Sequence, residues 1–175
     1  MSNSQEIVIS LRPAKLADLD LLKYWDEQPH VITSNPNDQW DWDTELRNNS
    51  EGREQLIAEI DSRPIGFIEI TDPAHDESNY WGDVEANVCA IDIWIGQEKD
   101  LGKGYGTKMM QLALAKCFAD TLVTAVLVDP LASNIRAHRF YKRLGFRLLE
   151  KRWFNRDECL VFRLSRTDWD SQTKS

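Results

Sequence analysis

Three of the eight glycines in this 175-residue chain fall within five residues, in the segment Asp100-Leu101-Gly102-Lys103-Gly104-Tyr105-Gly106-Thr107. The segment follows a predicted strand and precedes a predicted helix. Glycines in this context let the backbone curl, so that consecutive N–H groups and the helix N-terminus converge on one anionic group. The Gly-x-Gly-x-Gly spacing differs from both the Walker A loop and the dinucleotide-binding fingerprint. It predicts a strand–loop–helix unit that holds a phosphate-bearing ligand, and a glycine turn without a ligand is the alternative.

Hydrophobic periodicity indicates short alternating strands and helices, which is typical of an α/β or α+β domain. Strands are predicted at residues 7–11, 53–61, 65–71, 84–95, 123–128, 146–154 and 158–164. Helices are predicted at residues 16–25, 107–119 and 133–144, with Ser133 as an N-cap and Gly145 at the C-terminal end of the last. A chain of 175 residues suits one core rather than two. We expect a single domain over residues 1–175, with flexible termini at 1–5 and 167–175.

Composition argues against several classes of protein. Cys89, Cys117 and Cys159 are widely spaced and form no CxxC pair, which argues against disulfides and a metal site and favours a reducing compartment. The first residues lack the features of a secretory signal, and no apolar run approaches the length of a membrane span. A formal net charge of -8 disfavours nucleic acid as a partner. We expect a cytoplasmic protein with neither a membrane nor a nucleic-acid partner.

Charge is divided along the chain. Between Arg63 and Lys99 there is no lysine or arginine, whereas acidic residues recur through that stretch. From Lys99 to Arg166 the pattern reverses and basic residues predominate. One part of the molecule could therefore attract a cation and the other an anion, while two solvated faces remain the alternative.

One acidic residue lies within a predicted apolar strand. Because side chains alternate along a strand, Ile91, Ile93 and Ile95 share one face and Asp92 points to the other. A carboxylate there can attract an amine, but it is a weak base unless burial or neighbouring acids raise its pKa. Tryptophans beside acids, as in residues 39–43, would add stacking and cation–π contacts. A surface acid without a role is the alternative for Asp92.

The glycine loop and the helix that follows the next strand resemble the GCN5-related N-acetyltransferases. That family has a Gln/Arg-x-x-Gly-x-Gly/Ala loop and an Asn-x-x-Ala-x-x-x-Tyr helix that ends in Gly-Phe. The matching residues are Gly104, Gly106, Asn134, Ala137, Tyr141, Gly145 and Phe146. Leu101 departs from the Gln/Arg position, so Lys103 or Lys108 would make the phosphate contact. The resemblance is strongest over residues 92–146.

This resemblance implies a mixed, mostly antiparallel central sheet flanked by helices, with acetyl-CoA as co-substrate and no metal. The pyrophosphate would lie on the loop amides and the pantetheine arm along the strand near residues 94–95. Tyr141 would protonate the departing thiolate. The cofactor-binding residues implied in this way are Trp94, Ile95, Lys103, Gly104, Tyr105, Gly106, Thr107, Asn134 and Tyr141.

Residues 91–92, 101–108 and 129–137 are more narrowly similar to the aminoglycoside 6'-N-acetyltransferases, in which an apolar residue is common at the position of Leu101. This similarity implies that Asp92 engages the reactive amine, as a base or through water, and that Asp157 contacts the substrate. A cationic small molecule is the expected acceptor. The candidate substrate-binding residues are Trp40, Glu85, Asp92 and Asp157.

Two other functions remain open at this point. The first is a related acetyltransferase that acts on a hydroxylysine-type siderophore precursor or on a protein or peptide amine. A narrow pocket would favour that function, whereas an extended acidic pocket would favour an aminoglycoside antibiotic as the acceptor. The second is a non-catalytic module that binds acetyl-CoA without turnover. The chain is expected to act as a monomer or a homodimer.

Overall fold

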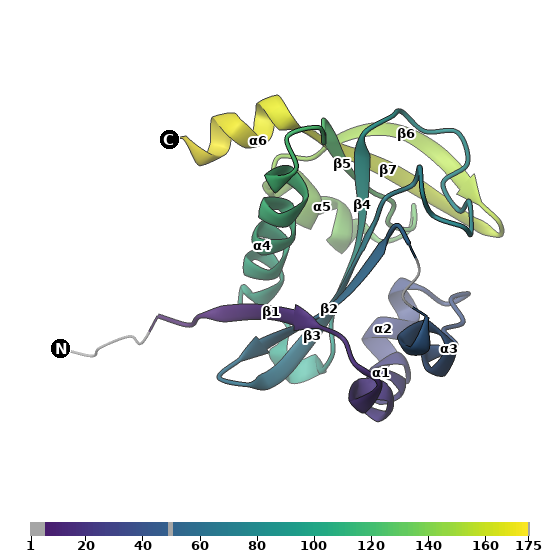
Figure 1. Cartoon of the computed structure of the whole chain (residues 1–175), viewed down its shortest axis with the longest axis vertical. Coiled ribbons are helices and arrows are strands. Elements are labelled where there is room, and N and C mark those ends of the chain that lie inside the picture. The colour runs from purple at the N-terminus through teal and green to yellow at the C-terminus, as the bar shows by residue number, and fades with distance from the viewer. Residues whose placement is uncertain (1–5, 49–50, 175) are drawn as a thin grey trace.

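The computed structural model describes residues 6–48 and 51–174. Its centre is a seven-stranded sheet with the order β1-β2-β3-β4-β5-β7-β6 (Figure 1). Neighbouring strands are antiparallel except for the parallel pair β4 and β5. The strands are β1 (Ile9–Pro13), β2 (Arg53–Ile60), β3 (Arg63–Thr71), β4 (Val88–Ile95), β5 (Ala125–Val128), β6 (Arg147–Phe154) and β7 (Asp157–Ser165).

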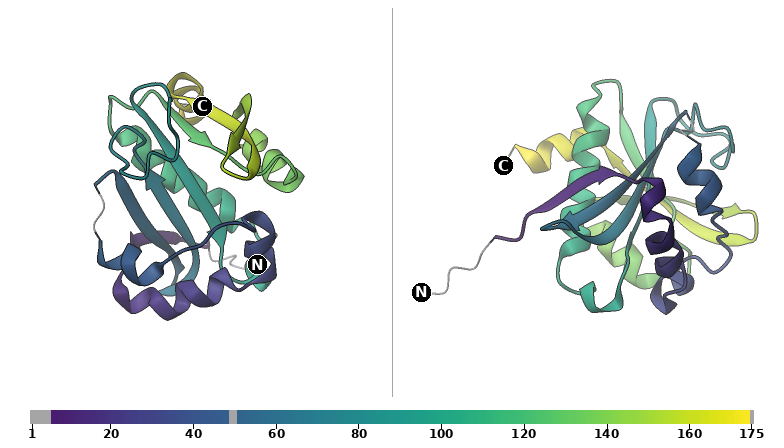
Figure 2. Two further views of the ribbon diagram at one scale, coloured as in Figure 1. Left: turned by 90° about the vertical axis from the view of Figure 1, so that its right-hand side faces the viewer. Right: turned by 60° about the horizontal axis from the view of Figure 1, so that its bottom comes forward.

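Helices cover both faces of this sheet, which confirms the expected mixed, mostly antiparallel sheet flanked by helices (Figure 1; Figure 2). The helices are α1 (Leu19–Asp26), α2 (Pro29–Ser34), α3 (Trp42–Arg47), α4 (Tyr105–Ala119), α5 (Ile135–Arg143) and α6 (Arg166–Thr173). Short 3-10 turns lie at Leu16–Asp18 and Glu98–Asp100. Among the described residues, no helix has the length and apolarity needed to cross a membrane. The expectation for residues 1–5 lies outside the described residues.

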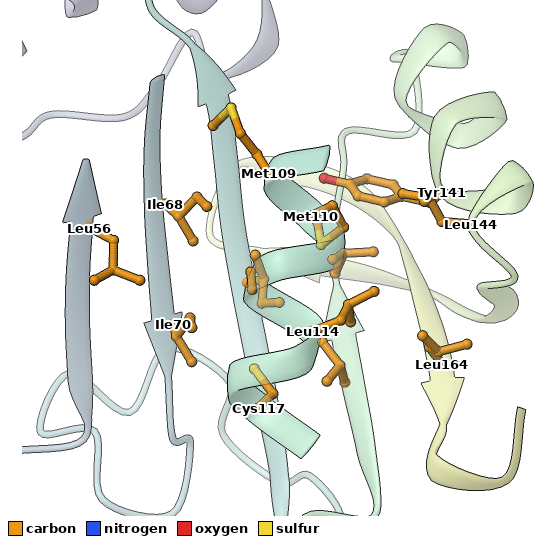
Figure 3. Close-up of a cluster of buried hydrophobic side chains, with 14 of the residues drawn as sticks. Leu56, Ile68, Ile70, Met109, Met110, Leu114, Cys117, Tyr141, Leu144 and Leu164 are labelled. Carbon is orange, nitrogen blue, oxygen red and sulfur yellow. The ribbon is translucent and has the colours of Figure 1, made fainter. Parts of the chain in front are cut away.

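Alternation along the central strands divides the core into two layers. On one face, Leu56, Ile68 and Ile70 of β2 and β3 pack toward α4 (Figure 3). On the other face, Phe67 and Trp94 pack with residues of α1, α2 and α3. The same alternation confirms the faces predicted for β4, because residues 91, 93 and 95 belong to the first layer and Trp94 belongs to the second. Asp92 therefore faces the side of α1–α3.

β4 and β5 diverge after a short stretch of pairing. They are paired only from Val88 to Ala90 on β4 and from Ala125 to Leu127 on β5. In the described part of the chain, residues 91–95 of β4 have a strand neighbour on the β3 side alone. The sheet therefore opens at the C-terminal ends of its two parallel strands, which is where ligands commonly bind in sheets with parallel strands.

Several local features differ from the sequence-based predictions. The helices α2 and α3 were not predicted, because each has only six residues and shows little periodicity. The N-cap of α5 is Asn134 rather than Ser133, and its side-chain oxygen accepts from the backbone N–H of Ala137 at 3.1 Å. Residues 166–173, most of the C-terminal segment that we expected to be flexible, form α6. Trp169 of this helix stacks on Phe118 of α4, with ring centroids 5.6 Å apart.

Candidate active site

A cleft of about 860 Å³ opens where β4 and β5 diverge. Its walls come from β3, β4, the glycine loop, α5, the segment 129–131 after β5, the segment 35–40 after α2, and the turn between β6 and β7. Segments that are far apart in the sequence therefore meet in one cavity.

Four of the carboxylates that line the cleft come from separate segments, and we call these four the carboxylate cluster. Asp92 comes from the middle of β4, Asp129 follows β5 directly, Asp38 follows α2, and Asp157 begins β7. Tyr80 Oη donates to Asp129 Oδ2 at 2.7 Å. Asn37 Nδ2 donates to Asp157 Oδ1 at 2.6 Å. In the described part of the chain, no hydrogen bond or ion pair reaches the Asp92 carboxylate.

The cluster is electrostatically unfavourable without a ligand. Asp92 is open to the cleft yet enclosed by its walls, which displace bulk water and raise its pKa well above the ordinary range, and repulsion from Asp129 adds to this. Displacement of water also raises the pKa of Asp129 to about 7. The same cause, with repulsion from Asp157, raises the pKa of Asp38 to about 6. A cation that enters the cleft would relieve this repulsion, so the cluster favours a ligand with several positive charges.

Aromatic rings form the wall beside the carboxylate cluster. Trp40 lines the cleft and stacks on Trp42, with ring centroids 4.6 Å apart and planes at 6°. Trp94 also lines the cleft, is 8% exposed, and its Nε1 has no hydrogen-bond partner among the described residues. Ile95 lines it from the opposite face of β4. Residues 40, 94 and 95 were all predicted site residues, and all three reach the cleft.

The glycine loop faces the same cleft. Gly104, Tyr105, Gly106 and Thr107 line it, as does Gly102. Gly102 and Gly104 have φ of +71° and +79°, in the left-handed region that glycine adopts without a steric penalty. A Cβ built on Gly104 would meet no atom within 4 Å, so this position borders open space at the N-terminus of α4. The backbone here fits an anionic group.

Neither lysine proposed for the phosphate contact lines the cleft with its side chain. The Lys103 ammonium lies 3.9 Å from the Asp100 carboxylate, and Lys108 Nζ donates to the Ile7 carbonyl at 2.8 Å. The bases that α5 contributes to the cleft are instead Arg136 and Arg143. Their signal in the sequence is the basic run of that helix, which by itself does not show which bases face a ligand.

Asp100 anchors the start of the loop, a role that the sequence analysis missed. Its side chain is 1% exposed and accepts from Arg63 Nη1 at 2.9 Å and Nη2 at 3.2 Å. The hydrogen bonds from Arg63 lower the pKa of Asp100, so it stays ionised at neutral pH. Because Arg63 begins β3, the pair fixes the loop to the sheet.

Tyr141 reaches the cleft from α5, and its hydroxyl oxygen points away from that helix toward α4 (Figure 3). Tyr141 as a whole is 8% exposed, and no hydrogen bond to its hydroxyl exists among the described residues. Burial, with the nearby carboxylates of Asp92 and Asp129, raises the pKa of Tyr141 above its ordinary value. The hydroxyl therefore stays protonated and can donate. Asn134 also lines the cleft, as the N-cap of the same helix.

Glu85 was predicted to bind substrate, but the structure places it outside the cleft. Its carboxylate pairs with Arg163 Nε on β7 at 2.6 Å and does not line the cleft. Glu85 and Asp92 are seven residue steps apart, which at about 3.3 Å per step allows a separation of up to roughly 23 Å. An acidic run along the sequence does not show which of its members lie at the open end of a strand.

Sequence reasoning assigned no site role to Asp38, Glu69 or Asp129, although all three line the cleft. Asp129 had a usable signal, because it follows a buried strand that pairs in parallel with β4. Glu69 had a weaker sequence signal, because it is a single acidic residue within an apolar strand. Asp38 had no sequence signal, since the path of its segment depends on α2, which was not predicted. Among the described residues, no group of three or more His, Cys, Asp or Glu side chains could hold a metal ion.

Comparison with known proteins identifies the family. The chain matches the acetyltransferase (GNAT) domain over residues 14–154, which is most of its length, and it belongs to that family. The resemblance seen in the sequence is thereby confirmed.

Individual relatives agree with this assignment. The chain is 27% identical over 160 residues to the aminoglycoside N(6')-acetyltransferase type 1 of Klebsiella pneumoniae, covering 83% of this chain and 77% of the relative. It is 24% identical over 148 residues to a lysine N-acyltransferase of Mycolicibacterium paratuberculosis, covering 80% and 66%. The crystal structure of the aminoglycoside acetyltransferase AAC(6')-Ib with coenzyme A and kanamycin has the same fold. It superposes with a TM-score of 0.84 at 24% identity, covering 96% of this chain and all of the other.

Proposed function

We propose that this chain transfers the acetyl group of acetyl-CoA to a primary amine of a polycationic small molecule, namely the 6'-amine of aminoglycosides. The observation that carries the proposal is the carboxylate cluster, which lies in the same cleft as the glycine loop and Tyr141. An acceptor with several ammonium groups matches this cluster, whose four carboxylates form no ion pair with a side chain that the structure describes. The name of the Klebsiella pneumoniae relative supports the same substrate class.

Acetyl-CoA would bind at the basic end of the cleft. The loop amides at 102–107 and the guanidinium groups of Arg136 and Arg143 fit its phosphates, because the loop borders open space and the two bases line the same cavity. The unpaired edge of β4 at residues 91–95 fits the pantetheine arm, since free backbone groups there can bond an amide-bearing chain. When bound, acetyl-CoA supplies a thioester, which an amine attacks only after it has lost a proton.

The protein's own groups handle the protons. Asp92 would accept a proton from the acceptor ammonium, directly or through water, and its enclosed position strengthens it as a base. Tyr141 would supply the proton that the leaving thiolate needs, because burial keeps its hydroxyl protonated. Asp38, Asp129 and Asp157 would hold the remaining ammonium groups. At about 4 Å and an effective dielectric near 20, each ammonium–carboxylate pair gains roughly 4 kcal/mol before desolvation.

A panel of acceptor amines tests the proposal. Release of free coenzyme A would be measured with kanamycin, tobramycin, amikacin, polyamines, hydroxylysine and short peptides. We expect turnover with the aminoglycosides that carry a free 6'-amine. An aminoglycoside with a hydroxyl at that position is the matched control and should be inert. Absence of coenzyme A release with every aminoglycoside would contradict the substrate assignment.

The lysine N-acyltransferase relative makes a smaller amino-acid amine the second candidate acceptor. The cleft argues against it, because hydroxylysine carries its own carboxylate, which the carboxylate cluster would repel. Turnover on hydroxylysine in the panel would favour this candidate. Binding of acetyl-CoA without turnover on any amine would instead indicate a non-catalytic module.

A further inference from the structure

A second acid lies directly beside Asp92. Glu69 of β3 is the register partner of Asp92 across the antiparallel pair β3 and β4, so both side chains lie on the same face of the sheet. Glu69 is 3% exposed and lines the cleft. Like charges directly opposite each other in a sheet destabilise it. Such a pair, in strands that are otherwise mostly apolar, requires a reason other than folding.

The two carboxylates have different surroundings. Gln55 Nε2 donates to Glu69 Oε2 at 2.9 Å, and Arg53 Nη1 lies 3.9 Å from Glu69 Oε1. Burial raises the pKa of Glu69, but Gln55 and Arg53 oppose this shift by stabilising its ionised form. The Asp92 carboxylate has no hydrogen bond or ion pair among the described residues, and its pKa is raised well above the ordinary range. Of the two acids, Glu69 is therefore better suited to hold the negative charge and Asp92 to hold the proton.

The charge of Glu69 is not neutralised by its own partner. Arg53 also bonds Asp76, with Nε 2.9 Å from Oδ1, and its Nη1 lies 3.7 Å from Glu45 Oε2. The positive charge of one guanidinium is therefore shared among three carboxylates. The other titratable or charged groups that act on Asp92 are Asp129 after β5, Asp38 after α2, Tyr80 before β4 and Tyr141 of α5. Among the charged groups named in this paragraph, Arg53 is the one that favours the ionised form of Asp92.

We infer that Glu69 is a positioning residue for the transfer, because its buried negative charge opposite Asp92 makes Asp92 a stronger proton acceptor for the acceptor ammonium. The inference rests on the proposed function, in which Asp92 is the base. It explains how an aspartate can take a proton from an amine, a task for which an isolated carboxylate is too weak. It also explains why a like-charged pair is tolerated at the open end of the sheet.

The test compares Glu69→Gln with Glu54→Gln. The first change keeps the shape of the side chain and removes its charge. Glu54 is the matched control, because it lies on β2 but pairs with Lys116 of α4 on the opposite face, with Nζ 3.0 Å from Oε1. Two measurements are made on each protein. One is the pH dependence of kcat with kanamycin, and the other is a carbon-13 NMR titration of the Asp92 carboxyl without substrate.

We expect Glu69→Gln to move the acid limb of the kcat profile, and the NMR titration of Asp92, to lower pH by about one unit. The plateau of kcat should fall several-fold, since a weaker base remains. Glu54→Gln should leave both titrations in place. A purely structural role of Glu69 would lower the melting temperature without moving either pH midpoint.

The two readouts separate this inference from the proposed function. If the Asp92 titration is unmoved in Glu69→Gln, the inference is wrong, whether or not kanamycin is a substrate. If the Asp92 titration moves but no aminoglycoside is acetylated, the electrostatic coupling holds and the substrate assignment fails. If the NMR titration moves and the kcat profile does not, Asp92 is not the base and the inference fails with it.

Discussion

Asp92 is surrounded by acidic residues that lie far from it in the sequence. Glu69 lies across the sheet, Asp129 follows β5 and Asp38 follows α2. An aspartate on an exposed strand would be fully ionised at neutral pH and would be a poor base. Enclosure and repulsion at this position raise the pKa of Asp92, so its ionised form is a stronger base toward an approaching ammonium.

Replacing Asp92 tests its role at the scale of a residue. We expect Asp92→Asn to lower kcat about 10²- to 10⁴-fold, the usual contribution of an acid or base group. Affinity for acetyl-CoA should be unchanged, because the loop at 102–107 and the bases of α5 form a different part of the cleft. Steady-state kinetics and a ligand-induced melting shift measure the two effects. Near-normal turnover would remove Asp92 from the mechanism.

The glycine loop works as an element, together with the helix that it precedes. Asp100 and Arg63 fix its start to β3, and Gly104 caps the N-terminus of α4 in a left-handed conformation. Because α4 has 15 residues and packs into the core, the loop amides are held against a rigid support. A site that binds phosphate through backbone N–H groups depends on this geometry rather than on the lysine side chains nearby.

Gly104→Val tests the loop. We expect acetyl-CoA to raise the melting temperature of the wild-type protein and to lose that effect in the variant. Valine at a φ of +79° is strained by about 1–2 kcal/mol, and its side chain would occupy the space in front of the amides.

The matched control for this change is Gly82→Val. Gly82 has a φ of +53° but does not line the cleft, so the change should lower the melting temperature while keeping the shift by acetyl-CoA. An undiminished shift in Gly104→Val would rule out the loop as the phosphate site.

At the scale of the whole molecule, the open cleft lowers stability at neutral pH. The pKa of Asp129 is about 7 and that of Asp38 about 6, compared with 3.8 for an unperturbed aspartate. The folded protein therefore binds more protons than the unfolded chain between about pH 4 and 7. Its free energy of unfolding should fall as pH rises through that window, because raised carboxyl pKa values favour the protonated folded state.

Thermal unfolding across pH checks this expectation. The melting temperature of the ligand-free protein should fall from pH 5 to pH 8, and Asp129→Asn should flatten the dependence. Asp61→Asn, at the exposed turn between β2 and β3, removes the same charge outside the cleft and should keep the slope. Equal slopes in wild type and Asp129→Asn would refute the explanation. Kanamycin should stabilise the protein more at pH 8 than at pH 5, since the ionised cluster binds cations.

Patterns that depend on near neighbours were readable from the sequence alone. The glycine loop, its strand and its helix were predicted within a few residues, because glycine spacing and apolar periodicity act locally. Alternation along β4 placed Asp92 away from the isoleucine face for the same reason. The helix with Tyr141 was predicted to within one residue at its N-cap. The family resemblance rests on these same local motifs.

The tertiary structure decided which charges meet. Asp38, Asp129 and Asp157 join Asp92 only because β4 and β5 diverge and because α2 and the β6–β7 turn close the cleft. Glu85 is closer to Asp92 in sequence than any of these residues, but it forms an ion pair with Arg163 instead. Sequence periodicity specifies the face of a strand on which a side chain lies. Strand order and register, which long-range packing determines, specify what that side chain meets there.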